Sequence, residues 1–116
     1  MNKKRVLSIV LVLCFIISLS ITSFAAYDFR DNYCAQVWFT ENDGKVNFEL
    51  YTTDYVTHYF KIEIVLIKDG SIVGENTVTK NNATYFKVAA SSAGVDTALA
   101  KFYIDGRQVS YLSQGK

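Results

Sequence analysis

Hydrophobic and polar side chains alternate along most of the chain after residue 32. In the most regular segment Phe60, Ile62 and Ile64 alternate with Lys61 and Glu63. Such alternation places one set of side chains on each face of a β-strand, so that each segment offers an apolar face to a core. No window of about twelve residues carries the apolar stripe of an amphipathic helix. We therefore expect an all-β protein.

Short polar segments interrupt the alternation, and several contain the Gly, Asp or Asn that tight hairpins need for positive φ angles. The clearest turn segments are Asn42-Asp43-Gly44, Lys68-Asp69-Gly70-Ser71 and Asp105-Gly106, with longer connections at Asn81-Asn82 and 91–94. Between them the pattern predicts seven strands, at residues 33–40, 45–52, 58–68, 71–79, 83–90, 97–104 and 107–112. This spacing is typical of a small antiparallel β-sandwich, immunoglobulin-like or similar.

Two segments carry further information about the arrangement of the strands. Residues 53–57 join the second and third predicted strands without a glycine, which suits a crossing from one sheet to the other. In the segment 60–67 the outward residues Val65 and Ile67 are also apolar. A strand that is apolar on both faces is typical of a covered, central position, and we expect one here.

The first 25 residues have a different pattern, that of a secretory signal peptide. Three basic residues at positions 3–5 precede an apolar run at 6–21, and the small residues Ser23 and Ala25 follow. This layout is typical of a segment that signal peptidase removes. The apolar run is shorter than the roughly 20 residues of a membrane-spanning helix, and no basic cluster follows it. We predict cleavage after residue 25, secretion of one domain spanning 26–116, and no stable membrane span after processing.

Removal of the leader changes the charge balance and the cysteine count. Three of the twelve Lys and Arg leave with it, so nine basic residues remain against eleven acidic ones. This slight negative charge gives no electrostatic reason to bind nucleic acid or an anionic membrane. Cys34 is then the only thiol, and no intrachain disulfide can form. We expect either a small buried hydrophobe at this position or a disulfide between two copies.

Candidate catalytic and metal-binding residues are few. His58 is the only histidine, and a structural zinc site needs four Cys or His ligands where 26–116 offers only Cys34 and His58. A nucleophile pair of Cys34 with His58, and a carboxylate pair of Glu49 with Glu63, are both conceivable. Ordinary strand positions and a solvated face of mixed charge explain the same residues more simply. We expect no enzymatic activity, no metal and no cofactor.

Aromatic residues are the most distinctive part of the composition. The chain after residue 25 holds 15 aromatic side chains among 91 residues. Trp38, Tyr51, Tyr85 and Tyr103 fall in the outward register of their predicted strands. If these strands share a sheet, the rings form an amphipathic surface that can stack on a sugar, a peptide or a protein partner. The alternative is cross-strand aromatic pairing that only stabilises the sheet.

Part of the chain resembles the small secreted bacteriocins of the lactococcin type. The resemblance spans about residues 57–104 and rests on Thr57-His58 before a strand, Lys87-Val88-Ala89 in a later strand, and Ala100-Lys101-Phe102-Tyr103-Ile104. It implies a β-sandwich toxin that acts on cell-wall synthesis in competing bacteria without enzymatic activity. The chain departs from the pattern at Phe86, where a tryptophan is expected, and in carrying Cys34 and a strand region before residue 57.

The sequence as a whole predicts a small secreted, non-enzymatic binding protein. We expect it to act at or outside the bacterial cell surface on a glycan, a cell-wall precursor or a protein. The alternative is a bacteriocin-like toxin. A homodimer through strand edges or through Cys34, with strand addition between subunits, is a further expectation.

Overall fold

The structure is a computed structural model that describes residues 26–30 and 32–116, with side chains from residue 32 onward. The predicted leader at 1–25 lies outside these residues. The described residues are all-β and contain no helix. The strands are β2 (Ala26–Arg30), β3 (Tyr33–Thr40), β4 (Lys45–Thr52), β5 (His58–Lys68), β6 (Ser71–Ala83), β7 (Tyr85–Ser91), β8 (Thr97–Ile104) and β9 (Arg107–Gly115).

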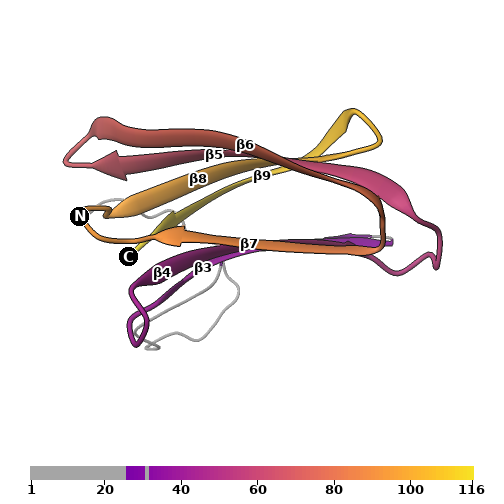
Figure 1. The fold of residues 1–116 in the computed structure, drawn as a ribbon, viewed down its shortest axis with the longest axis horizontal. Coiled ribbons are helices and arrows are strands. Elements are labelled where there is room, and N and C mark those ends of the chain that lie inside the picture. The colour runs from indigo at the N-terminus through magenta and orange to yellow at the C-terminus, as the bar shows by residue number, and fades with distance from the viewer. Residues whose placement is uncertain (1–25, 31) are drawn as a thin grey trace.

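The strands form two antiparallel sheets that face one another as a sandwich (Figure 1). One sheet has the order β2-β3-β4-β7 and the other the order β6-β5-β8-β9. Every pairing within the two sheets is antiparallel. The prediction of a small antiparallel β-sandwich is therefore confirmed.

Each of the seven predicted strands is present, but some limits differ. The last strand, predicted at 107–112, continues to Gly115, and further differences lie in the middle of the chain. The predicted connection at Asn81-Asn82 is part of β6, which continues to Ala83. Asn82 has a φ of 52°, and its backbone N–H bonds to the Asn81 side chain at 3.1 Å. The register of β6 against β5 shifts between His58 and Phe60, so this pair forms a β-bulge and not a loop. An additional strand, β2, pairs with β3.

The predicted hairpin turns are present and show why their residues are required. Asp69 and Gly70 have φ angles of 53° and 78°, and Asp105 and Gly106 have φ angles of 53° and 84°. Two successive residues with positive φ form the two-residue turn whose twist matches an antiparallel hairpin. Asp and Gly tolerate this backbone region better than other residues do.

The core lies between the inner faces of the two sheets. Its fully buried side chains include the alternating residues of β4, β5 and β8 that the sequence pattern places on one face. These are Val46, Phe48, Leu50, Phe60, Ile62, Ala98, Ala100 and Phe102, with Val37 of β3. Each has a relative exposure of 1% or less. The outward residues Val65 and Ile67 of β5 are half-buried, and β5 is an internal strand of its sheet, as predicted.

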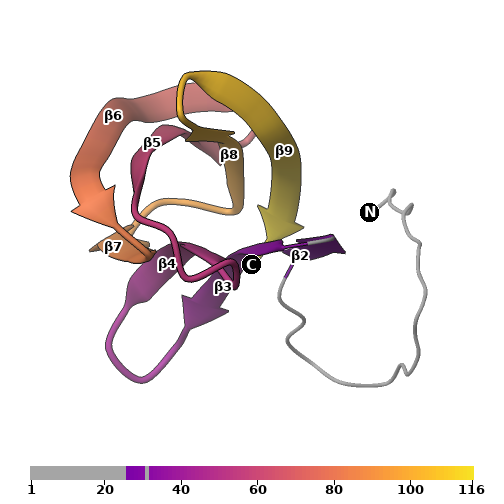
Figure 2. The ribbon, with the colours of Figure 1, turned by 90° about the vertical axis from the view of Figure 1, so that its right-hand side faces the viewer.

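The chain crosses between the sheets at several points, two of which position the surfaces described below. Residues 53–57 lead from β4 to β5, as the sequence predicts. The second crossing is the single residue Thr84: Ala83 pairs with His58 in one sheet, and Tyr85 pairs with Tyr51 in the other. The Thr84 carbonyl accepts a hydrogen bond from the Thr52 N–H at 3.0 Å. Figure 2 shows β6 and β7 on the same side of the sandwich.

We predict that Phe48→Ala destabilises the protein by about 3–5 kcal/mol, because the ring is fully buried and its loss leaves a cavity. Urea unfolding followed by circular dichroism measures this change. Val73→Ala is the control, since Val73 is 55% exposed and its truncation should alter the free energy of unfolding by about 0.5 kcal/mol or less. Equal effects of the two substitutions would contradict the assignment of the core.

Candidate functional site

Three of the four aromatic residues selected from the sequence lie on the outer face of the sheet β2-β3-β4-β7. Tyr51 of β4 faces Tyr85 of β7 across the ladder. Trp38 of β3 faces Asn47 of β4. Asn47 and Tyr51 are four residues apart on the same strand, so their side chains, and that of Trp38, lie on the same side of the sheet. We call this surface the ring face and define it by Gln36, Trp38, Glu49, Tyr51, Tyr85 and Lys87.

A carboxylate at the centre of the ring face holds its polar side chains in place. Glu49 Oε1 accepts a hydrogen bond from Gln36 Nε2 at 2.9 Å. Glu49 Oε2 accepts one from the Tyr85 hydroxyl at 2.7 Å. This bond, together with partial desolvation, raises the pKa of Tyr85 above 10.0. Three neighbouring strands, β3, β4 and β7, are thus linked on their outer side.

The rings lie on both sides of this polar row. The Tyr51 and Tyr85 rings have centroids 6.3 Å apart and are tilted by 31°. The Lys87 ammonium group lies 5.2 Å from the centroid of the Trp38 ring. Tyr85 is 49% exposed, and Trp38 and Tyr51 are half-buried. The sheet therefore presents aromatic, amide, carboxylate and ammonium groups together on a solvent-facing surface.

Tyr103 does not belong to this surface. It lies on β8, in the sheet β6-β5-β8-β9. Its hydroxyl donates to Glu63 Oε1 at 2.9 Å, and the Lys61 ammonium group lies 4.3 Å from its ring centroid. The outward register predicted from alternation is consistent with these outer-face contacts, but alternation does not show to which sheet a strand belongs. The condition of a shared sheet is therefore met for Trp38, Tyr51 and Tyr85 and is not met for Tyr103.

The carboxylate pair considered from the sequence is also divided between the sheets. Glu49 lies on β4 and Glu63 on β5, in different sheets. Each accepts a hydrogen bond from a tyrosine hydroxyl of its own sheet. The structure thus places these two side chains in separate hydrogen-bond networks, and neither network contains the paired carboxylates of a glycosidase.

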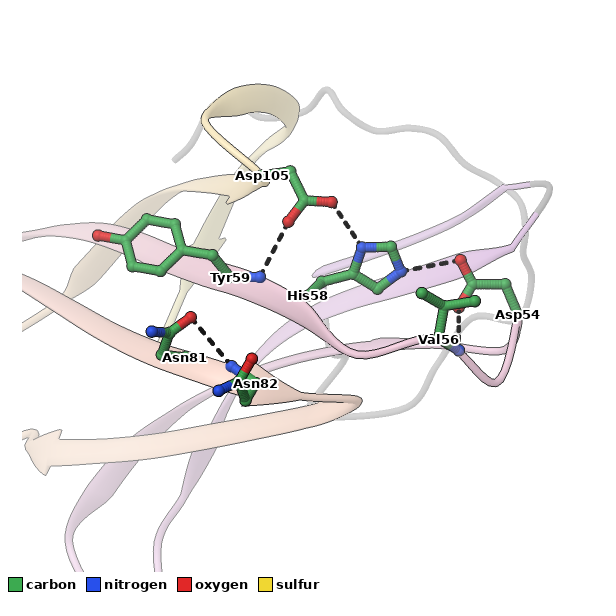
Figure 3. Close-up of polar contacts among 7 residues, drawn as sticks. All are labelled: Asp54, Val56, His58, Tyr59, Asn81, Asn82 and Asp105. Atoms are coloured by element: carbon green, nitrogen blue, oxygen red, sulfur yellow. Dashed lines mark hydrogen bonds and ion pairs between the residues drawn. The ribbon is translucent and has the colours of Figure 1, made fainter.

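A second polar cluster, which alternation along the chain does not reveal, surrounds His58 (Figure 3). His58 Nε2 lies 2.8 Å from Asp54 Oδ2, and Nδ1 lies 2.6 Å from Asp105 Oδ2. The other oxygens of the two carboxylates accept backbone N–H groups, from Val56 at 3.1 Å and from Tyr59 at 3.0 Å. We call Asp54, His58 and Asp105 the Asp–His–Asp cluster. It joins the β4–β5 connection, the start of β5 and the β8–β9 turn.

The cluster shifts the pKa values of its three members in opposite directions. Hydrogen bonds to Asp105 and Asp54 raise the pKa of His58 above 6.5, against a smaller opposing effect of burial. The backbone N–H groups of Val56 and Tyr59, together with His58, lower the pKa values of Asp54 and Asp105 below 3.8. Arg107 lowers that of Asp105 further. A protonated imidazole between two carboxylates is thus the favoured form over an interval of mildly acidic pH.

This geometry supports a structural role for His58. Both ring nitrogens are engaged by carboxylates, so neither is available to accept a proton from a nucleophile or a water molecule. The pairing of His58 with Cys34, against which the sequence favours ordinary strand positions, is not formed, because Asp54 and Asp105 occupy both nitrogens. Cys34 is 1% exposed, which favours its interpretation as a small buried hydrophobe.

The two aspartates of the cluster bind opposite nitrogens of the ring and so do not converge on one point. Within residues 26–30 and 32–116, no three His, Cys, Asp or Glu side chains are grouped so that they would hold a metal ion. The spacing of Asp54 and His58 is visible in the sequence. Their connection to Asp105, 47 residues after His58, depends on the tertiary structure.

Comparisons with known proteins do not place the chain in a family. No protein-family model, no curated protein and no solved structure matches it. The resemblance to lactococcin-type bacteriocins therefore stays a prediction. In the described part of the chain, no helix is long and apolar enough to cross a membrane.

We predict that His58→Ala lowers the melting temperature by an amount that depends on pH. The folded-state pKa of His58 is raised above 6.5, so its contribution is complete below pH 6.5 and is lost as the pH rises through the raised value. The two aspartates have lowered pKa values, so their contribution is complete above pH 3.8 and is lost at lower pH. The difference between wild type and variant should therefore be largest between pH 3.8 and 6.5.

Differential scanning fluorimetry across this pH range measures the difference. Glu41→Gln, which changes an exposed carboxylate in the β3–β4 turn, serves as the control and should give a parallel curve to wild type. A His58→Ala difference that stays constant from acidic to alkaline pH would contradict the charged cluster.

Proposed function

We propose that the protein is a non-enzymatic binding protein that acts outside the bacterial cell, and that its ring face binds a glycan chain of the cell surface. The observation that carries this proposal is the gathering of Trp38, Tyr51 and Tyr85 on one sheet face around the Gln36–Glu49 hydrogen bond. Export, the first part of the proposal, rests on the leader pattern in residues 1–25.

The combination of groups on the ring face suits a sugar better than a purely apolar partner. Aromatic rings offer a flat apolar surface on which the C–H face of a pyranose packs. Glu49 and Gln36 offer hydrogen-bond acceptors and donors beside the rings, and Lys87 adds an ammonium donor. A sugar ring presents both an apolar face and equatorial hydroxyl groups, so it uses both kinds of contact at once.

The shape of the surface favours a chain over a small, enclosed ligand. Small-molecule sites are concave and enclose most of the ligand. The ring face is the outer side of a β-sheet, where the side chains of β3, β4 and β7 stand on strands about 4.8 Å apart. Trp38 and Tyr51 lie on different strands and at different positions along them. Successive units of an extended polymer can therefore contact successive rings.

The hydrogen bonds within the face support the proposal in a second way. Tyr85 and Gln36 are oriented by Glu49 before any ligand arrives. Side chains that are already ordered lose less conformational entropy on binding, which increases the affinity that their contacts provide. A solvated face without such bonds would have to order these side chains when the ligand binds.

We predict that soluble peptidoglycan fragments change the fluorescence of Trp38, the only tryptophan of the chain, in a saturable titration. Tyr85→Ala should weaken binding by about tenfold, since it removes a half-exposed ring and the donor to Glu49. Tyr85→Phe should have a smaller effect because it keeps the ring.

The matched control is Tyr111→Ala. Tyr111 is 56% exposed on β9 of the other sheet, so its loss should leave the titration unchanged. The absence of any fluorescence change with peptidoglycan fragments and with other bacterial glycans would overturn the proposed function.

A further inference from the structure

The edge strand β6 is long, exposed and weakly protected. It is a terminal strand of the sheet β6-β5-β8-β9 and spans thirteen residues. Ile72 and Val73 near its start are 58% and 55% exposed. The strand contains no proline, and Glu75 and Lys80 are its only charged residues. Natural proteins normally protect such an edge, because its backbone N–H and C=O groups pair readily with another strand.

The other edges of the sandwich differ from β6. At β9, the Val109 carbonyl accepts a hydrogen bond from the Tyr33 hydroxyl at 2.6 Å, and the strand lies beside β2 and β3 (Figure 2). β7 spans only seven residues, and β2 only five. β6 is therefore the longest edge available for strand addition in the described part of the chain.

An apolar groove lies beside this edge, between β5 and β6 of one sheet and β7 of the other. Its volume is about 220 Å³. Side chains of both sheets line it, among them Leu66 and Val78 from one sheet and Val88 and Ala90 from the other. A strand added beside β6 would place its inward side chains over this groove. The exposed edge and the groove thus favour the same kind of occupant, an extended strand.

We propose that this occupant is the β6 strand of a second copy, paired antiparallel about a two-fold axis at Thr77. The register of β6 against β5 is regular from Gly74 to Lys80 and shifts on both sides of this run. Thr77 is its central residue. A two-fold pair centred there uses the whole regular segment, and the irregular ends bend away from it.

The side chains of β6 are compatible with this self-pairing. In an antiparallel pair centred on Thr77, Glu75 of each copy faces Thr79 of the other, and Asn76 faces Val78. Directly opposed residues lie on the same face of the sheet, so inward residues meet inward ones. Neither Glu75 nor Lys80 meets a like charge. Threonine and valine also favour strand pairing, because branched side chains pack well against cross-strand neighbours.

The dimer would form a continuous sheet of eight strands from two copies of the four-stranded sheet. The ring face belongs to the other sheet and does not include β6, so both ring faces stay available. Two binding faces on one particle increase the apparent affinity for a polymer by simultaneous engagement. The dimer itself does not depend on the proposed function, and it is tested without any glycan.

Sedimentation velocity over a range of protein concentrations, with a reducing agent present, tests the proposal. Wild type should show a reversible monomer–dimer equilibrium. Thr79→Glu should raise the dissociation constant at least tenfold, because the new carboxylate faces Glu75 of the second copy. Thr79 faces Lys61 of β5 within its own sheet, so the same change should not impair folding. The double variant Thr79→Glu with Glu75→Lys should restore the dimer, since opposite charges then face one another.

The control is Ser113→Glu, an exposed position on β9 of the same sheet, and it should leave the dissociation constant unchanged. Circular dichroism of each variant verifies that the fold is retained. Wild type that sediments as a monomer at all concentrations would overturn the proposal. So would a dimer that Thr79→Glu does not weaken, or one that the double variant fails to restore.

Discussion

Burial of aromatic and branched aliphatic side chains between the two sheets is the interaction on which the rest of the structure depends. Residues 26–116 contain one cysteine, so no intrachain disulfide supports the fold. The large core side chains Phe48, Phe60 and Phe102 come from both sheets and are fully buried. Because a domain of this size buries a smaller fraction of its surface than a larger domain does, its stability depends strongly on these few rings. Their alternation with outward residues also determines what the two outer faces display.

Polar contacts then hold the ends of the sandwich to the core. The Asp–His–Asp cluster connects the β4–β5 crossing to the β8–β9 turn, two segments that the chain separates by about half of its described length. At the crossing from β6 to β7, the Thr84 carbonyl accepts a hydrogen bond from the N–H of Thr52. Both contacts involve residues at the end of β4 or just after it, Thr52 and Asp54. The segment after β4 is thus bonded both to the β6–β7 crossing and, through His58, to the β8–β9 turn.

The sequence predicts those features that depend on local pattern. Alternation predicts the strands and which of their residues face the core, and Asp-Gly pairs predict the hairpin turns, because each depends on neighbouring residues alone. The partner of each strand is not encoded locally. Tyr103 therefore has the outward register expected for a shared surface but lies in the other sheet. The same limit applies to Asp105, whose contact with His58 depends on how β5 and β8 pair. Asn81-Asn82 resembles a loop in sequence, yet the bulge absorbs it within β6.

The two outer faces of the sandwich carry similar groups, and the difference between them explains why only one is proposed as a binding surface. On each face a tyrosine hydroxyl donates to a glutamate. On the β5–β8 face the Lys61 ammonium lies 4.3 Å from the Tyr103 ring, closer than the 5.2 Å that separates Lys87 from the Trp38 ring on the ring face. On the ring face the corresponding tyrosine, Tyr85, is 49% exposed and contacts another ring. The ring face thus has aromatic rings that contact one another across strands, whereas on the other sheet Tyr103 and the exposed Tyr111 each lie beside a lysine ammonium group. The exposed edge strand β6 belongs to this second sheet.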